Sequence, residues 1–404
     1  ASESPKICPD YAGIVIPPNI APLNFQIEET ALAYRVTLRS NVGEPITVSS
    51  RDGLIDIPAR PWHRLLRQNT GGVLTIEMLL KRTGAGWVKG ATITNHIAPD
   101  ALDGYLVYRQ LRPLYNLYTD MGLYQRNLAN FDQTEVLENR RFNRGCLNCH
   151  TFLQHSSSNM FFHVRGVPDN PIILAQNSTV RPIAKTAGYS SWHPSGRLLA
   201  YSVNRLSLFY HTRGETRDVF DADSDLHIYR LDSNVVVVPP AIAVSNRLET
   251  WPSWAPDGRY LYYCCAEQLP RDRYREVRYD LMRISYDLDT DRWGEPEVLL
   301  SARDTQASAA QPRVSPNGRW LALVLSKYGN FPIYQTNADL FLADLGSREL
   351  RRLEINSDQT DAWHGWSSNS RWMVFSSKRR DGVFTHPYFT HVDEQGRFSK
   401  PFIL

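Results

Sequence analysis

The sequence predicts a mainly β protein: a β-propeller of five or six blades, preceded by a small antiparallel β-sandwich-like domain and a partly helical linker. Three observations support this fold class. One residue pattern recurs four times in the second half of the chain. Short apolar runs alternate with turn residues throughout, and the spacing of apolar residues becomes helical within 113–145. The predicted domains are residues 1–112, 113–158 and 159–404.

The repeated pattern reads Trp-x-Pro, then Asp, Asn or Ser, then Gly-Arg and four apolar residues, with small departures between copies. The copies lie at 191–201, 253–263, 313–323 and 365–375. Pro followed by Asp or Asn and Gly favours a tight turn, because Gly adopts positive φ at little cost. The apolar run that follows predicts a strand buried on both faces. Successive copies start 62, 60 and 52 residues apart, which leaves room for the four strands of a propeller blade.

Further strand-like runs complete each unit, at 224–231, 279–286 and 338–345. Two more runs, 159–165 and 171–183, look like half of a further blade. These units resemble the propeller repeats of the TolB family over residues 156–404. The resemblance implies a TolB-like propeller.

The first part of the chain has a different pattern. Runs of mixed alternation predict strands at 32–38, 73–80 and 91–96, as in a small antiparallel β-domain. In the following segment, 113–145, apolar residues recur at a spacing that favours helix in part of it. These residues are Leu114, Leu117, Met121 and Leu128.

The linker contains the sequence Cys146-Leu-Asn-Cys149-His150, which has the C-x-x-C-H form of a c-type haem attachment site. Each thiol adds across one haem vinyl group to give a thioether, and His150 follows directly as the proximal iron ligand. A zinc site would need a second Cys pair with similar spacing, and a thioredoxin-like site would need a βαβ context. The sequence has neither, so we predict one covalent haem c.

The second axial ligand stays open at this point. Met160 and His163 are the nearest options, His155 is a third, and a distant residue or an empty position is also possible. On a strand Met160 and His163 face opposite sides, so only one of them can reach the iron. A Met ligand raises the haem potential, a second His lowers it, and an empty position permits ligand chemistry. Arg165 is expected to pair with a haem propionate.

The other cysteines are Cys8 and the adjacent pair Cys264 and Cys265. A vicinal disulfide, a bridge from Cys8 to one of the pair, and buried thiols all remain possible. The acidic run 221–225 resembles the start of an EF-hand loop but lacks its Gly and terminal Glu, so we expect a solvated turn. His63 and His193 are expected to have structural roles.

Composition narrows the function classes. The chain has 42% hydrophobic and 22% charged residues and a formal net charge of +3, which argues against disorder and nucleic-acid binding. Its longest apolar run is too short to span a membrane. The chain starts at Ala1, as after removal of a leader, and haem c is attached outside the cytoplasm. We therefore expect a periplasmic or extracellular protein, with any membrane association through a partner or a lost lipid anchor.

The order of motifs adds a second resemblance. Distinctive segments at 118–130, 137–140, 146–152, 160–166 and 192–197 follow the β-domain. Their order resembles a family of exported bacterial mono-haem cytochromes with a TolB-like propeller, often met in Bacteroidetes, for which no activity is assigned. A looser similarity is to the α subunit of hydrazine synthase. That subunit has a second haem site and this chain has one C-x-x-C-H, so the same chemistry is not expected.

Three functional hypotheses follow. The first is an exported cytochrome that transfers electrons to a redox protein partner, or serves as a haem-bearing subunit of a multi-subunit complex. The second is a haem enzyme with an open iron site for a small nitrogen or oxygen species. The third is a propeller scaffold with a structural haem. The sequence favours an electron-transfer or assembly subunit over a stand-alone enzyme.

Overall fold

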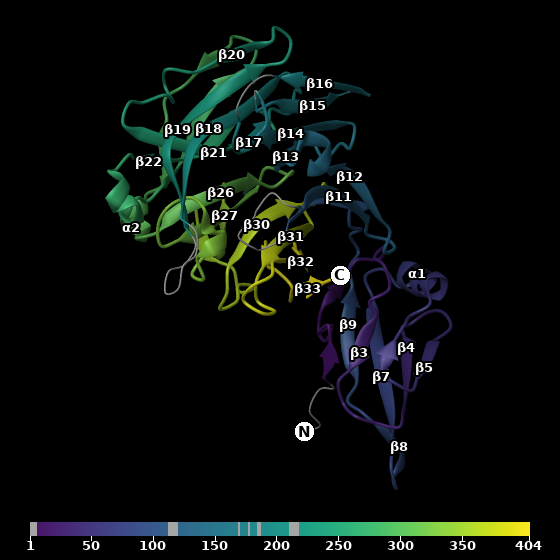
Figure 1. Ribbon diagram of the computed structural model, residues 1–404. Coiled ribbons are helices and arrows are strands. Elements are labelled where there is room, and N and C mark those ends of the chain that lie inside the picture. The colour runs from purple at the N-terminus through teal and green to yellow at the C-terminus, as the bar shows by residue number, and fades with distance from the viewer. Residues whose placement is uncertain (1–5, 112–119, 169, 177, 184–186, 210–217) are drawn as a thin grey trace.

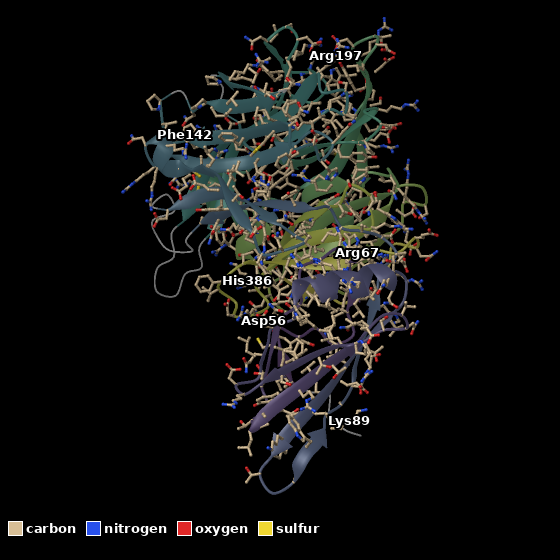
Figure 2. The ribbon with its side chains drawn as sticks, turned by 90° about the vertical axis from the view of Figure 1, so that its right-hand side faces the viewer. Asp56, Arg67, Lys89, Phe142, Arg197 and His386 are labelled. Carbon is tan, nitrogen blue, oxygen red and sulfur yellow. The ribbon has the colours of Figure 1, made fainter. Side chains whose placement is uncertain are left out.

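The computed structural model describes residues 6–111, 120–168, 170–176, 178–183, 187–209 and 218–404. Within these residues the chain is mainly β, and an N-terminal β-domain lies against one side of a propeller (Figure 1). In Figure 2, Arg67 lies at the junction of the two parts and Lys89 lies near the far end of the β-domain. The predicted fold class is confirmed.

The N-terminal domain has two sheets and one helix within its described residues. The smaller sheet has the order β1-β3-β6, and the larger has the order β2-β9-β7-β4-β5 with β8 paired to β7. The bounds are β1 (Ile7–Cys8), β2 (Val15–Ile16), β3 (Phe25–Ile27), β4 (Ala33–Arg39), β5 (Ile46–Ser50), β6 (Leu54–Ile55), β7 (Val73–Arg82), β8 (Gly86–Lys89) and β9 (Ile93–Ile97). Strands β4, β7 and β9 confirm the three predicted strands.

The helix α1 (Ala59–Gln68) was not predicted from the sequence. Its buried residues Trp62, Leu65 and Leu66 share one face, as expected for positions three and four residues apart. They pack into the same core as both sheets, and the Trp62 indole donates a hydrogen bond to the Ile20 carbonyl (3.0 Å). The helix therefore closes one end of this domain's core.

Five antiparallel sheets of the described chain follow one another around the propeller, in the orders β13-β14-β15-β16, β17-β18-β19-β20, β21-β22-β23-β24 with β25 on β23, β26-β27-β28-β29, and β30-β31-β32-β33. Their bounds are β13 (Cys146–Phe152), β14 (Asn159–Arg165), β15 (Ile172–Gln176), β16 (Thr179–Ile183), β17 (Ser190–Trp192), β18 (Leu198–Phe209), β19 (Asp218–Arg230), β20 (Val235–Val237), β21 (Arg247–Trp254), β22 (Tyr260–Glu267), β23 (Asp280–Asp287), β24 (Arg292–Trp293), β25 (Glu297–Leu300), β26 (Ser308–Val314), β27 (Trp320–Ser326), β28 (Asp339–Asp344), β29 (Leu350–Arg352), β30 (Asp361–Trp366), β31 (Trp372–Ser377), β32 (His386–His391) and β33 (Phe402–Ile403). Short helical turns are α2 (Ala302–Thr305), η1 (Asn139–Phe142), η2 (Arg271–Glu276) and η3 (Pro332–Tyr334).

The four sequence repeats form the first hairpins of the last four blades, where each predicted turn joins the first strand to the second. The turn Gly has positive φ in three copies: 72° at Gly196, 74° at Gly258 and 73° at Gly318. In the fourth copy Ser370 takes this place with φ 61°, and its hydroxyl accepts a hydrogen bond from the Asn317 amide (3.0 Å). The repeat thus specifies one turn geometry, and the fourth copy retains it without Gly.

A three-stranded sheet, β10-β11-β12, completes the ring in the manner of a sixth blade. Its strands are β10 (Tyr105–Leu111), β11 (Met121–Asn127) and β12 (Gln133–Glu138). Met121 and Leu123 of β11 pack against Met160 and Phe162 of β14 in one apolar cluster, so this sheet lies face to face with the first blade.

The helix predicted within 113–145 is wrong for the described residues, because Met121 and Leu123 alternate on one face of a strand instead. Leu114 and Leu117 lie outside the described residues. The described remainder contains β11, β12 and the 3-10 turn η1.

The C-x-x-C-H motif lies in the first blade and not in a linker. Cys146, Cys149 and His150 belong to β13, which pairs with β14 from Cys146 opposite Arg165 to Phe152 opposite Met160. The propeller therefore begins before residue 159. The strand-forming Thr151 and Phe152 continue the motif into the blade, which corrects the predicted boundary.

The N-terminal domain contacts the last blade directly. The Trp372 indole donates to the Asp100 carbonyl (3.1 Å), and the Ser368 hydroxyl donates to the Asp103 carboxylate (2.5 Å). Trp372 and Phe389 are buried in the N-terminal core. No helix among the described residues is long and apolar enough to cross a membrane.

Candidate functional site

Four of the innermost strands of the ring contain the same irregularity. In β13, β21, β26 and β30 the pairing register shifts by one residue, so that two residues of the strand oppose one of its neighbour, and the first of these two residues has positive φ. These residues are Cys149 (43°), Trp251 (54°), Gln311 (55°) and Trp363 (51°). The next residues are His150, Pro252, Pro312 and His364. The two histidines therefore occupy equivalent positions in the first and last blades.

An aromatic plug fills the middle of the channel at the level of these bulges. We use this name for Tyr189, Trp251, Trp363 and Phe331. The rings of Tyr189 and Trp251 stack with centroids 3.3 Å apart, and Trp363 meets Trp251 edge-on at 5.2 Å. The Cys149 side chain packs against the same cluster. Residues after the bulges lie on one side of this plug.

On that side the channel opens into a cavity of about 2080 Å³. Its wall includes β10 and the inner strands after their bulges, among them Cys149, His150, Arg313 and His364. It extends outward to the exposed side chains of Tyr105 and Phe384, so it is open to solvent. Its volume is well above the roughly 300–1,000 Å³ of typical small-molecule pockets. The cavity is therefore large enough for a cofactor of haem size.

His150 lines the cavity as a neutral imidazole. Burial is the main factor that lowers its pKa to about 4, and Arg109 acts in the same direction while the Val107 carbonyl opposes them. The ring Nε2 lies 3.4 Å from that carbonyl, which is long for a hydrogen bond. A neutral histidine held by a backbone carbonyl on one nitrogen matches the usual environment of a metal ligand.

The two motif thiols lie in different packing environments. Cys149 lines the cavity beside the aromatic plug, whereas Cys146 packs against the apolar cluster between β11 and β14. Burial raises the pKa of both thiols, and the charge of Cys146 contributes to the pKa of Cys149, so the two side chains are close. Both are therefore protonated near neutral pH.

His364 is the most unusual group on the cavity wall. It is only 6% exposed, yet neither ring nitrogen has a hydrogen-bond partner in the described structure. Burial is the main factor that lowers the His364 pKa to about 3. The Arg313 charge lowers this pKa as well, and the Ala322 backbone raises it by less. The imidazole is therefore neutral, and both nitrogens retain unused bonding capacity.

Two arginines give the cavity a positive wall. Arg109 donates to the Asn148 side chain (2.8 Å), and Arg313 donates to the Pro312 carbonyl (3.1 Å). Neither forms an ion pair with a carboxylate of the described residues. Partly buried guanidinium groups without a carboxylate favour the binding of an anion, such as a haem propionate or a small anionic ligand.

The residues that the sequence predicted for a haem site are only partly brought together. Met160 is buried in the cluster between β11 and β14, and His163 is buried on the other face of β14, so neither lines the cavity. The His163 ring contacts the Asn170 carbonyl (3.2 Å) through Nε2 and accepts a hydrogen bond from Arg165 (3.2 Å) through Nδ1. Arg165 also donates to the Ala187 carbonyl (3.0 Å) and lies outside the cavity wall. His155 lines the cavity and is exposed.

The other cysteines and His193 lie outside the cavity wall. Cys264 and Cys265 are buried free thiols in β22, and Cys8 is an exposed free thiol. The His193 ring contacts the Ser195 hydroxyl (2.7 Å) and the Gly258 carbonyl (3.1 Å), which joins the turns of neighbouring blades. The structural role predicted for His193 is confirmed.

On the other side of the plug the channel is packed with polar side chains. Asp221 is buried within β19, so the solvated turn predicted for 221–225 is wrong. Its Oδ2 accepts hydrogen bonds from the Asn204 and Asn330 amides. Burial raises the Asp221 pKa to about 7, more than these two hydrogen bonds lower it. The Trp251 indole donates to the Asn330 carbonyl (2.9 Å) and connects this network to the plug.

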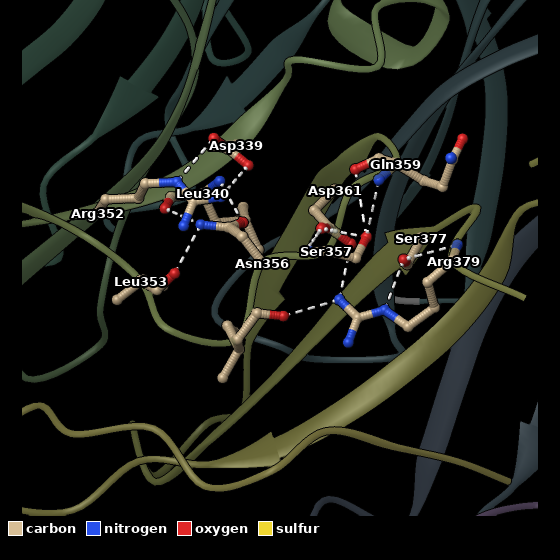
Figure 3. Close-up of polar contacts among 11 residues, drawn as sticks. Asp339, Leu340, Arg352, Leu353, Asn356, Ser357, Gln359, Asp361, Ser377 and Arg379 are labelled. Carbon is tan, nitrogen blue, oxygen red and sulfur yellow. Dashed lines mark hydrogen bonds and ion pairs between the residues drawn. The ribbon is translucent and has the colours of Figure 1, made fainter.

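The start of β30 is fixed by a buried ion pair. Asp361 is fully buried, and its carboxylate accepts a hydrogen bond from Arg379 (2.8 Å) (Figure 3). Arg379 also donates to the Ile355 carbonyl (2.8 Å) and the Ser377 hydroxyl (2.8 Å). Two residues beyond Asp361, the Trp363 amide donates to the Gln311 side chain (2.7 Å). These contacts fix the strand that contains His364.

The sequence interpretation missed Arg109, Arg313 and His364. A signal existed for His364: aligning Cys149-His-Thr-Phe152 with Trp363-His-Gly-Trp366 places both histidines one residue after the bulge. The two arginines have no comparable pattern, because their common cavity forms only when the ring closes.

No family model and no curated protein matches this chain. Similar solved structures include an oligogalacturonate lyase from Vibrio parahaemolyticus, at 10% identity and TM-score 0.38, covering 69% of this chain and 85% of that one. An oligogalacturonate lyase in complex with manganese has 12% identity and TM-score 0.41, covering 75% of this chain and 74% of that one. A prolyl endopeptidase has 13% identity and TM-score 0.41, and its match covers 64% of this chain and 36% of that one. Such low scores carry no argument about activity, and the propeller is established by the sheet order of the chain itself.

Proposed function

We propose that this protein is an exported c-type cytochrome that binds one covalent haem in the cavity and transfers electrons, alone or as a subunit of a larger redox assembly. The observation that carries the proposal is the placement of Cys149 and His150, two members of a C-x-x-C-H motif, on the wall of a cavity of about 2080 Å³. The haem would supply one-electron chemistry at its iron.

The donor set fits a haem. His150 is neutral, as a metal ligand must be, and Cys149 is a protonated thiol available for addition to a vinyl group. In that addition the S–H bond breaks, a C–S bond forms, and the hydrogen goes to the second vinyl carbon. Arg109 and Arg313 are placed to bind the propionates. The second thioether requires the Cys146 side chain to turn from its apolar cluster toward the cavity.

The test is production in a host with a haem-attachment system, followed by intact-mass and reduced-minus-oxidised visible spectra. We expect one covalent haem in the unsubstituted protein. We expect loss of covalent haem in the double variant Cys146→Ser, Cys149→Ser, and normal loading in the control Cys264→Ala, since Cys264 is buried outside the motif. A folded protein without covalent haem contradicts the proposal.

The second candidate, an enzyme with an open iron site, is supported by the size and positive wall of the cavity. Arg109 and Arg313 suit a small anion as well as a propionate. Spectra with CO and cyanide distinguish the two functions. Low-spin iron that ignores CO supports electron transfer, and high-spin iron that binds CO supports the enzyme.

A further inference from the structure

We propose that His364 is the second axial ligand of the haem iron, with His150 as the first. This inference rests on the proposed function, since it needs a haem in the cavity. Both imidazoles line the same cavity from different blades, one on β13 and the other on β30. The chemical class of the site is therefore a bis-histidine c-type haem.

The hydrogen bonding of the other buried histidines makes His364 distinctive. His163 and His193 each have contacts from both ring nitrogens, to backbone or side-chain groups within 3.5 Å. Neither nitrogen of His364 has a partner in hydrogen-bonding geometry among the described residues, and the Ala322 backbone acts on the ring only from outside that geometry, although the residue is 6% exposed. A buried polar group without a partner destabilises the folded protein, because it has lost its bonds to water and gained none. A bond from one nitrogen to a metal removes part of that cost.

The bulges give a second, independent argument. Four inner strands share the bulge, and where the next residue is a histidine, at His150 and His364, its side chain lines the cavity. In the two middle blades that residue is Pro252 or Pro312, which has no side-chain donor atom. In the first and last blades it is His150 or His364. The same backbone device therefore presents a nitrogen ligand from two blades and none from the others.

The wall around His364 is rigid enough to hold a ligand. Asp361, at the start of β30, is held by Arg379, and the Trp363 amide is held by Gln311. The Trp366 indole donates to the Arg313 carbonyl (3.1 Å), which fixes the end of β30. Ligands on strands fixed by such contacts keep their orientation, as outer-shell partners do in metal sites.

The nearer residues in the sequence are less suitable. Met160 and His163 are buried away from the cavity, and the nitrogens of His163 are already hydrogen-bonded. His155 reaches the cavity wall but is exposed and lies on the same blade as His150. A second ligand from β30 avoids both difficulties.

Visible and electron paramagnetic resonance spectra of the haem-loaded full chain test the inference. We expect low-spin, six-coordinate iron that does not bind CO in the unsubstituted protein. We expect His364→Ala to keep its covalent haem, become high-spin and bind CO, and return to low spin when imidazole is added. His364→Met is expected to stay low-spin with a raised midpoint potential, because a thioether replaces an imidazole.

Met160→Leu and His163→Gln are the matched controls, and both should retain the spectrum of the unsubstituted protein. An unchanged low-spin spectrum in His364→Ala overturns the inference and leaves the covalent haem standing. High-spin, CO-binding iron before any substitution also overturns it. Absence of haem from the unsubstituted protein instead refutes the proposed function. If His364→Ala does not fold, His364→Gln takes its place with the same expectations.

Discussion

The two ends of the propeller channel are built in opposite ways. On one side of the aromatic plug, Asp221, Asn204 and Asn330 fill the channel and bond to one another. On the other side, His150 and His364 face a cavity of about 2080 Å³. The same blades and the same bulged inner strands form both ends. The difference shows that one scaffold can be packed where it needs stability and hollow where it can bind a ligand.

The largest expected effect concerns the ion pair that supports the cavity wall. Arg379→Met leaves the fully buried Asp361 carboxylate unpaired, so we expect the free energy of unfolding to fall by about 3–5 kcal/mol. The matched control is Arg352→Met, because the Arg352–Asp339 pair has the same 2.8 Å distance but half-exposed arginine (Figure 3). That control should cost no more than about 1 kcal/mol. Urea unfolding measures the free-energy loss in both variants. Equal losses would show that burial does not make the Arg379–Asp361 pair more important than the Arg352–Asp339 pair.

A substitution in the aromatic plug is expected to lower the free energy of unfolding by nearly as much. Trp251 is fully buried and stacked on Tyr189, so Trp251→Ala should lower the free energy of unfolding by about 3–5 kcal/mol. Trp87, which is 41% exposed in the N-terminal domain, provides the comparison. Trp87→Ala should stay within about 1 kcal/mol of the parent. A loss below 1 kcal/mol for Trp251→Ala would show that the two ends of the channel are not separated by a packed layer.

The packed end should also set a pH dependence. Burial raises the Asp221 pKa from 3.8 to about 7 in the folded state, so the folded state binds more protons than the unfolded state between these pH values. Stability should therefore fall as pH rises from about 4 to 7, by an amount on the order of a few kcal/mol. Asp221→Asn keeps an acceptor for Asn204 and Asn330 and should flatten this part of the profile. The test is to measure the free energy of unfolding from about pH 4 to 7 in the unsubstituted protein and in Asp221→Asn. An unaltered slope in the variant would show that Asp221 does not cause the pH dependence.

The smallest effect compares two buried histidines in the haem-free chain. His193→Ala removes contacts to Ser195 and Gly258 and should cost about 1–2 kcal/mol. His364→Ala removes no hydrogen bond and opens onto an existing cavity, so we expect a change within about 1 kcal/mol. Thermal unfolding of the two variants gives the comparison. A larger loss for His364→Ala would mean that its imidazole has a packing role.

Local patterns predicted much of the fold. The repeated turn, which is Pro-[Ser/Asp/Asn]-Gly in three copies and Ser-Asn-Ser in the fourth, specified the hairpins of the last four blades, because turn chemistry and an apolar strand act within about ten residues. The helical interpretation of 113–145 failed at Met121 and Leu123, where two-residue alternation against β14 determined the structure. The helix α1 was missed because Pro61 stands in its first turn, where Pro is tolerated but weakens the sequence pattern.

The site was less predictable than the fold. Cys149 and His150 could be singled out from the sequence because the C-x-x-C-H pattern is local along the chain. Arg109, Arg313 and His364 come from strands far apart in sequence, and only closure of the ring brings them to one cavity. Proximity in sequence instead favoured Met160 and His163, which lie on opposite faces of the second strand of the blade, and neither of them lines the cavity.

The way the ring closes has a mechanical consequence. The C-terminal strand β33 pairs within its own blade, and no described sheet combines strands from both ends of the propeller. The ring therefore has a seam between β10–β12 and β30–β33, beside the cavity, that no described strand ladder crosses. Parting the ring at this seam breaks side-chain packing but no ladder of backbone hydrogen bonds. Closure at this seam therefore rests on side-chain contacts, such as those of Trp372 and Ser368 with the segment just before β10.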